Sequence, residues 1–410
     1  MAEHARSGGA PAGKPSASGP AVALIHDWVV DLGGAERVLA VLHAAFPEAP
    51  LYTLFARAES LARLAFPPAV VTASWLQALP SIQRHYRSLL PLFPLAVRSL
   101  KVADYDLVVS SSHAVAKGVR TRPGQPHLCY CHTPMRYAWD MEAQYLAQHR
   151  LHRGWRAGVA RAVLARIRDW DRRSAVTVTR FVANSRATAA RIARCYGRPA
   201  DVVFPPVDVD RFQPRAVKDD FFLFASRLVP YKRADLAVRA CARLGLRLVV
   251  VGDGPAAAVC RRDAGPRTEF LGRQDDATVA DLMARARALV FPGEEDFGIV
   301  MVEAQAAGTP VIAYGRGGAC DSVVPADGAN WDRATGLYAQ AQTVEGMEAA
   351  LQAFLGWEGR FQSVVLRRHA EQFAAPAFVA RMRRIASETA GGWGAPAGDS
   401  QTALPVPLGA

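Results

Sequence analysis

Short apolar runs alternate with longer amphipathic stretches along most of this chain. In the first half the apolar runs read AVALIHD, YDLVVSS, HLCYCHT, RFVANS and DVVFPPV. A second series follows with FFLFASRL, LRLVVVGDG, TEFLG, ALVFPG and PVIAYG. Apolar runs of this length, separated by segments with helical periodicity, indicate buried parallel strands joined by helical crossovers. We therefore expect an α/β protein with two doubly wound domains, one for each series.

Consecutive prolines, Pro205 and Pro206, separate the two series, because proline suppresses helix and restricts the preceding residue. Both ends of the chain are small, polar and rich in proline and glycine, so they cannot repay their ordering entropy. The expected organisation is a disordered tail (1–20), an N-terminal α/β domain (21–205), a C-terminal α/β domain (206–375), a last helix (376–390) and a second disordered tail (391–410).

The composition fits two cores and sets few limits on function. Half of the 410 residues are hydrophobic, and a chain of this length is too long for one ordinary core. We expect a cytoplasmic protein, because no apolar run approaches the ~20 residues of a membrane-spanning helix and no signal peptide is recognisable. The net charge of +12 suits nucleic acid, an anionic membrane surface or a phosphate-bearing substrate. We find no nucleic-acid-binding motif that would select the first.

The most informative segment contains two carboxylates, Glu295 and Glu303, eight positions apart across an expected loop-to-helix junction. The first backbone N–H groups of that helix, at Phe297, Gly298 and Ile299, lack helical acceptors and can meet an anion. Glu303 can accept two hydroxyls of a ribose, and Glu295 can bind hydroxyls of a second sugar. These features suit a clamp for a nucleotide sugar. The alternative is that both carboxylates merely favour a helix start.

Two cations precede this segment, Arg227 just after an expected strand and Lys232 near the next helix start. Breaking a glycosyl–phosphate bond transfers negative charge to the leaving nucleotide, and fixed cations stabilise that charge without a metal ion. The sequence Asp208-x-Asp210 could suggest a metal site, but at a domain junction after Pro-Pro-Val it fits a turn better. We therefore expect no metal ligands and no cofactor.

Loops that follow other expected strands supply further candidates. Gly33 and Gly34 form a loop that can bring backbone amides close to a phosphate or a sugar, although a simple tight turn explains them equally well. His113 and His132 end two strands of the first domain, where each can face the cleft or act structurally. Three more side chains near His132 suit a sugar or phosphate acceptor, or aromatic core packing, namely Arg136, Tyr137 and Trp139. In the second domain, a turn at Gly252 and Asp253 can reach the nucleotide base or ribose.

The segment PGEEDFGIVMVEAQAAGTPVIAYGRGG resembles the E-x7-E signature of family 4 retaining glycosyltransferases. FASRLVPYKRAD resembles the R-L-x-x-x-K element of the same family, and SSSHAVAKGVRT and CYCHTPMRYAWD resemble its mannosyltransferase-type branch. The resemblance extends from Ala21 to about Phe373. One departure is Asp321, because the family more often has Glu after the pair Gly317-Gly318, so its reach here is shorter.

The resemblance implies a GT-B fold, in which two Rossmann-like domains face each other across the active site and the last helix crosses back to the first domain. It implies a retaining, metal-independent hexosyltransferase. The favoured reaction moves mannose from GDP-mannose to a lipid-linked or polysaccharide acceptor, and the donor phosphate itself takes the acceptor's proton. In this scheme Arg227 and Lys232 neutralise the diphosphate, Glu295 orients the donor sugar and Glu303 binds ribose. His113 contacts the donor sugar, His132 lies beside it, and the Gly-Gly loop lies under the donor.

Other functions stay open at this stage. A sugar-nucleotide epimerase shares this architecture and needs no acceptor. An arginine-rich nucleic-acid-binding protein on a degenerate transferase fold would fit the charge. Two basic amphipathic stretches, residues 155–170 and 81–100, can adsorb to an anionic membrane from its inner face or pack on the core like ordinary helices.

Overall fold

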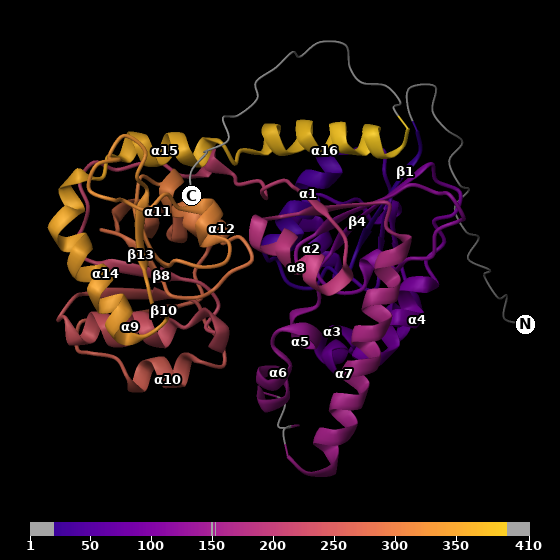
Figure 1. Cartoon of the computed structure of the whole chain (residues 1–410), viewed down its shortest axis with the longest axis horizontal. Coiled ribbons are helices and arrows are strands. Elements are labelled where there is room, and N and C mark those ends of the chain that lie inside the picture. Colours follow the sequence, from indigo (N-terminus) through magenta and orange to yellow (C-terminus); the bar gives the residue numbers. More distant parts are fainter. Residues whose placement is uncertain (1–19, 149–150, 152, 392–410) are drawn as a thin grey trace, which may run out of the picture.

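A computed structural model describes residues 20–148, 151 and 153–391 of the protein. Two parallel β-sheets with their packed helices form two lobes that lie side by side (Figure 1). This arrangement confirms the expected pair of doubly wound α/β domains. The tails expected at 1–20 and 391–410 lie outside the described residues, apart from residues 20 and 391.

The N-terminal sheet has seven parallel strands in the order β3-β2-β1-β4-β5-β6-β7. Its central strands are buried along their whole length, which explains their continuous apolar sequence. The strands are β1 (Val22–His26), β2 (Leu51–Thr53), β3 (Val71–Ala73), β4 (Leu107–Ser112), β5 (His127–Cys131), β6 (Arg180–Ala183) and β7 (Ala200–Val202). The helices are α1 (Gly34–Ala45), α2 (Ala58–Arg63), η1 (Pro68–Val70), η2 (Trp75–Ala78), α3 (Ile82–His85), η3 (Tyr86–Leu92), α4 (Phe93–Arg98), η4 (Ala116–Gly118), α5 (Arg136–Trp139), α6 (Glu142–Gln148), α7 (Gly154–Ser174), η5 (Ala175–Thr177) and α8 (Arg186–Tyr196).

The C-terminal sheet has six parallel strands in the order β10-β9-β8-β11-β12-β13. The strands are β8 (Phe222–Ala225), β9 (Leu248–Val251), β10 (Thr268–Gly272), β11 (Leu289–Phe291), β12 (Val311–Tyr314) and β13 (Gly336–Ala339). The helices are η6 (Val209–Arg211), η7 (Pro230–Lys232), α9 (Ala234–Arg243), α10 (Ala257–Arg262), α11 (Asp276–Arg285), α12 (Ile299–Ala306), α13 (Ala319–Ser322), α14 (Val344–Trp357), η8 (Glu358–Arg360), α15 (Ser363–Glu371) and α16 (Ala375–Thr389).

Each sheet has one point at which its strand order reverses. The chain leaves β1 toward β2 and β3 on one side and later returns to place β4 on the other side. The second sheet repeats this pattern between β8 and β11. Ligands of doubly wound sheets bind beyond the carboxyl ends of the strands at such a reversal. The loops that follow β1, β4, β8 and β11 are therefore the ones on which the site depends.

The chain crosses between the lobes twice, and the two crossings touch. The Val207 N–H donates to the Phe373 carbonyl at 2.8 Å, and Val207 pairs with Ala374 in an isolated parallel bridge. Helix α16 then runs back over the N-terminal lobe (Figure 1), where Phe378 enters the core against Tyr130, with ring centroids 5.4 Å apart. The division at residues 205 and 206 stays our proposal for the domain boundary.

The two basic amphipathic stretches are only partly buried. In α7 the expected apolar side is split, because Ile167 is buried whereas Trp155 and Val159 are 76% and 55% exposed. In the earlier stretch Phe93 belongs to the core and Leu95 is 62% exposed. Every helix within the described ranges is too short or too polar to span a bilayer.

Replacing Phe378 with alanine should lower the free energy of unfolding by roughly 3 kcal/mol, because a fully buried aromatic side chain leaves a cavity between α16 and the first sheet. Denaturant unfolding measures this loss. Arg381→Ala, an exposed position on the same helix, is the matched control and should change stability by less than about 0.5 kcal/mol. Equal losses in the two variants would show that α16 is not part of the first core.

Candidate active site

The reversal points of the two sheets border one cavity of about 410 Å³. Five residues that the sequence singled out line it, namely Gly33, Gly34, His113 and Tyr137 from the N-terminal lobe and Arg227 from the C-terminal lobe. The cavity therefore lies between the lobes, where the sequence places the site. The other candidate residues are not among those that line it, and each has a definite place in the surrounding structure.

A buried carboxylate, Asp27, fixes the turn that presents His113. Its two oxygens accept the backbone N–H groups of His113, Ala114, Val115 and Ala116 at 2.6 to 2.9 Å. One of these oxygens also lies 3.1 Å from Nδ1 of His113. Burial works to raise the pKa of Asp27, but His113 and the N–H groups outweigh it, so the pKa lies below its usual value. The carboxylate thus stays ionised and holds the turn.

Three histidine rings gather at this edge of the first sheet. The ring centroid of His26 lies 5.8 Å from that of His113 and 6.4 Å from that of His132. The Ser111 hydroxyl joins two of them, at 3.0 Å from Nδ1 of His26 and 2.8 Å from Nε2 of His132. Burial, with His113 nearby, lowers the pKa of both His26 and His132 to about 3, so both are neutral. His132 thus supports the site from behind the cavity wall.

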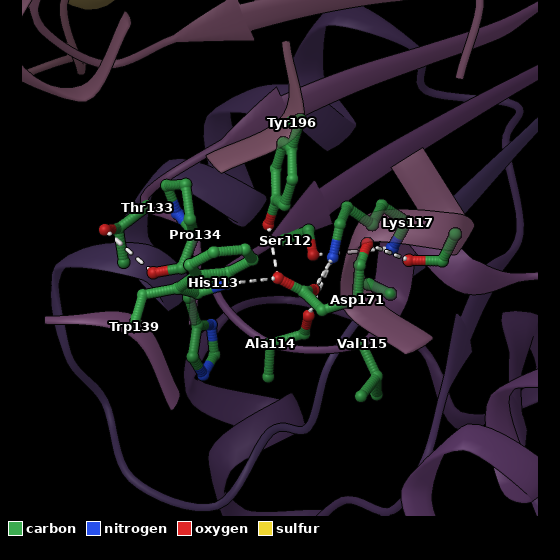
Figure 2. Close-up of polar contacts among 12 residues, drawn as sticks. Ser112, His113, Ala114, Val115, Lys117, Thr133, Pro134, Trp139, Asp171 and Tyr196 are labelled. Atoms are coloured by element: carbon green, nitrogen blue, oxygen red, sulfur yellow. Dashed lines mark hydrogen bonds and ion pairs between the residues drawn. The ribbon is translucent and has the colours of Figure 1, made fainter. Parts of the chain in front are cut away.

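A second buried ion pair braces the same turn from behind. Lys117, at the end of the turn, pairs with Asp171 of α7, and Figure 2 shows this pair to the right of His113. The Asp171 carboxylate also accepts Nε1–H of Trp139 and the Tyr196 hydroxyl, each at 2.8 Å. Burial works to lower the pKa of Lys117, but Asp171 outweighs it and the pKa is raised. Trp139 is therefore part of this buried network.

The second lobe brings Lys232 and Glu295 together. Nζ of Lys232 donates to the Ser226 hydroxyl at 2.6 Å and lies 3.3 Å from Oε1 of Glu295. The glycine pair explains how the Glu295 loop is held, because the Gly318 N–H donates to the Glu295 carbonyl at 2.8 Å. A Cβ on Gly318 would lie 2.1 Å from Cα of Phe297, so only glycine allows this approach.

The N-termini of α1 and α12 meet across the cleft. A Cβ on Gly34 would lie 3.1 Å from Cδ1 of Ile299. Gly298 precedes α12 with a φ of +87°, a conformation that favours glycine, and a Cβ there would lie 1.9 Å from Cε of Met301. The Phe297 side chain belongs to the core, so only its backbone can serve a ligand. The first N–H groups of both helices thus converge on one region.

Glu303 lies in a square of alternating charges instead of along the cavity. Its Oε1 accepts Nη1 of Arg37 at 3.2 Å and Nη2 of Arg211 at 2.8 Å. Both arginines also bind Asp276, Arg37 at 2.9 Å and Arg211 at 3.2 Å. Burial raises the pKa of Glu303, and the two arginines oppose that rise. A ribose that binds Glu303 must therefore share or displace these guanidinium groups.

The turn at Gly252 and Asp253 packs against the loop that carries Arg227. Gly252 has a φ of +126°, and a Cβ there would lie 1.9 Å from the Ser226 carbonyl oxygen. The Asp253 carbonyl accepts the Leu228 N–H at 2.9 Å. Close packing thus accounts for the glycine, and the turn supports the Arg227 loop.

Further ion pairs join the lobes around the cavity. Asp296, next to Glu295, binds Arg191 and lies 3.8 Å from Arg136, both from the first lobe. Asp321 accepts the backbone N–H of Arg186 at 2.7 Å at the start of α8, and its side chain is 2% exposed. Its short carboxylate thus reaches across the cleft to the other lobe.

Sequence reasoning missed several of these residues. Asp27 carries one readable signal, a carboxylate directly after a buried strand, and Glu36 carries another, because it sits three residues after Gly33 and accepts its N–H at 2.8 Å. No local signal in the sequence identifies Arg37 or Arg211, because their partner is distant in the chain. Arg37 and Glu303 are 266 positions apart.

Two known families match the chain. Residues 32–211 match the family described as "Glycosyltransferase Family 4", and residues 207–360 match "Glycosyl transferases group 1". Curated relatives include "D-inositol 3-phosphate glycosyltransferase" of Rhodococcus opacus (strain B4), 31% identical over 229 residues, or 48% of this chain and 50% of the relative. The Mycobacterium tuberculosis (strain F11) protein of the same name is 31% identical over 239 residues, or 51% and 49%. The chain spans about half the length of these curated relatives.

Solved structures share the fold. Anabaena Alr3699/HepE in complex with UDP-glucose superposes with a TM-score of 0.64 at 17% identity, over 90% of this chain and 100% of that one. Sucrose-phosphate synthase from Thermosynechococcus elongatus gives a TM-score of 0.64 at 19% identity, over 90% and 98%. At such identities the likeness shows a GT-B fold. The two family matches together span residues 32–360 and support a glycosyltransferase of the family 4 type.

Proposed function

We propose that the protein is a hexosyltransferase that moves a sugar from a nucleotide-sugar donor to an acceptor hydroxyl in the cleft between its lobes. The observation that carries this proposal is the shared cavity, which His113 lines from one reversal point and Arg227 from the other. Lys232 and Glu295 form an ion pair on the same lobe as Arg227, and Lys232 also bonds to Ser226, which precedes Arg227 in the sequence. In this proposal Arg227 at the cavity and Lys232 on the same lobe stabilise the charge that a departing diphosphate develops.

The reaction we propose is retaining and metal-independent. The bond between the anomeric carbon and the β-phosphate oxygen breaks while the acceptor oxygen bonds to the same face of that carbon. The acceptor's proton passes to the departing phosphate, so no protein nucleophile is needed. Arg227 and Lys232 stabilise the charge on the diphosphate, Glu295 orients the donor sugar, and Asp27 holds His113 against it. In this scheme Glu303 binds the ribose after Arg37 yields one position on Oε1.

The donor we propose is GDP-mannose, because the segments around His113 and His132 resemble the mannosyltransferase-type branch. UDP-glucose, which Anabaena Alr3699/HepE binds in its crystal, is the competing donor. The acceptor we propose is a polysaccharide or lipid-linked glycan. An inositol phosphate, after which the Rhodococcus and Mycobacterium relatives are named, is the competing acceptor.

The exposed end of α7 supports a peripheral membrane location on the cytoplasmic side. Trp155 and Val159 are exposed there, and the exposed charged side chains of α7 are arginines apart from Asp169. An aromatic tip among arginines suits an anionic lipid surface. Within the described residues, the exposed arginines of α7 and of the residue before it are Arg153, Arg156, Arg161, Arg166, Arg172 and Arg173.

Calorimetric titration with GDP, UDP, ADP and their common sugars, without and then with a divalent cation, tests the donor half. We expect metal-independent binding of GDP and GDP-mannose. Arg227→Ala should lower kcat by about 100-fold with little change in melting temperature. Arg243→Ala removes a surface charge of the same lobe and is the matched control. Preference for UDP would overturn the donor, conversion of the donor without an acceptor would favour an epimerase, and no binding would overturn the function.

Asp27→Asn should destabilise the protein and slow transfer, because the amide NH₂ cannot accept the N–H groups that one carboxylate oxygen now satisfies. The expected loss at pH 7 is roughly 3 kcal/mol of unfolding free energy. Since the folded pKa of Asp27 is depressed, its contribution is present above the ordinary Asp pKa of about 4 and fades as pH falls below it. Denaturant unfolding from pH 7 to pH 3 measures the loss of stability and its dependence on pH. A loss no larger than that of the exposed Asp104→Asn would contradict the role of Asp27.

Trp155→Ala should weaken binding to phosphatidylglycerol vesicles by about tenfold, or ~1.4 kcal/mol, because the indole ring leaves water when the helix docks. Vesicle co-sedimentation measures the change, and phosphatidylcholine vesicles should bind neither protein. Val176→Ala, which is 77% exposed just after α7, is the control. If Trp155→Ala and wild type sediment alike, the tip of α7 is not a docking site.

A further inference from the structure

One wall of the interlobe cavity is aromatic and belongs entirely to the N-terminal lobe. Trp28 anchors this wall, because its ring packs at 5.6 Å from Phe93 and meets the His113 ring edge-on at 4.6 Å. The rings of Tyr137 and Tyr145 pack against each other with their centroids 5.7 Å apart. The aromatic wall comprises Trp28, Tyr86, Phe93, Tyr137 and Tyr145.

The polar groups of this cavity are mainly acidic on the same side. Asp31 and Glu36 line it, and Glu36 is held by the Gly33 N–H at 2.8 Å. Of the described side chains that line the cavity, Arg227 is the only lysine or arginine, and it comes from the opposite lobe. The proposed function commits Arg227 to the donor diphosphate. A phosphate on the acceptor would then face two carboxylates without a cation of its own.

The Tyr137 hydroxyl points to a ligand independently of the aromatic rings. It is buried and has no hydrogen-bond partner among the described residues. Buried polar groups without a partner are rare in folded proteins, because each forfeits its bonds to water. On a residue that lines a cavity, such a hydroxyl is satisfied when a ligand supplies the missing donor or acceptor.

We propose that the aromatic wall is the acceptor subsite and that the sugar residue it takes is uncharged. The C–H face of a hexose packs on aromatic rings, while its hydroxyls donate to Asp31 and Glu36 and bond with the Tyr137 hydroxyl. The wall adjoins His113, so a sugar on it lies next to the place of donor transfer. The inference rests on the proposed function and adds the chemical class of the acceptor residue. Any phosphate or pyrophosphate of a larger acceptor stays outside the cavity.

Direct binding tests this subsite in the full chain saturated with GDP, or with UDP if calorimetry selects it. Saturation-transfer NMR compares methyl α-mannoside, methyl α-glucoside and methyl α-galactoside with mannose 6-phosphate, glucose 6-phosphate and inositol 3-phosphate. We expect at least one neutral glycoside to bind more tightly than every phosphorylated compound. Tyr137→Phe, which keeps the ring, should weaken that binding threefold to tenfold and leave nucleotide affinity unchanged.

Tyr105→Phe is the matched control, because its hydroxyl already has a partner, Tyr52, at 3.0 Å and it does not line the cavity. Tighter binding of a phosphorylated compound would overturn the uncharged acceptor, and so would absence of glycoside binding to a protein that binds nucleotide. Equal effects of Tyr137→Phe and Tyr105→Phe would remove Tyr137 from the subsite. Failure to bind any nucleotide would instead overturn the proposed function itself.

Discussion

The Asp27 carboxylate is the interaction on which the catalytic side of the first lobe depends. Strand β1 ends at His26, so the carboxylate emerges at the reversal point of the sheet and meets four N–H groups of the turn after β4. Four amide dipoles and a nearby imidazole stabilise a buried charge that could not otherwise leave water. The same hydrogen bonds fix the conformation of the turn and the position of His113.

Several of the many arginines join the two lobes across the cleft. Arg37, Arg186 and Arg191 of the first lobe each bind a carboxylate of the second. Guanidinium groups suit this task, because a planar fork can hold two carboxylates at once, as Arg37 holds Asp276 and Glu303. These three arginines thus face carboxylates across the cleft, whereas the outer end of α7 presents its arginines to solvent.

The fold could be predicted from the sequence because its signals are local. Apolar runs, prolines and glycines identified both sheets, and a parallel sheet can only be joined by crossovers. The positions of Gly33, His113 and Arg227 followed from the same rule, since each comes just after a strand that borders a reversal point. Lys232 and Glu295 lie together, as a shared role requires, although their contact needs the closing of the Gly317-Gly318 loop against Glu295.

What could not be predicted depends on partners distant in the chain. The residues near Glu303 in the sequence do not predict its contacts with Arg37 and Arg211. The residues near Asp27 do not predict that the turn after β4 will surround it. Trp155 and Ile167 share one side of a helix by periodicity, yet only Ile167 meets the core, because α7 extends beyond the body of the lobe (Figure 1). Periodicity fixes the face of a helix and leaves open how much of its length has a neighbour.

The two chain crossings between the lobes have a mechanical consequence. Because the segments at Val207 and Ala374 run parallel and are joined by a hydrogen bond, they form a two-stranded hinge. A single strand would let the lobes twist freely, whereas a paired one resists twist and permits bending about one line. Bending between the lobes would therefore be confined to one line, about which the helix ends at Gly34 and Ile299 would separate or approach.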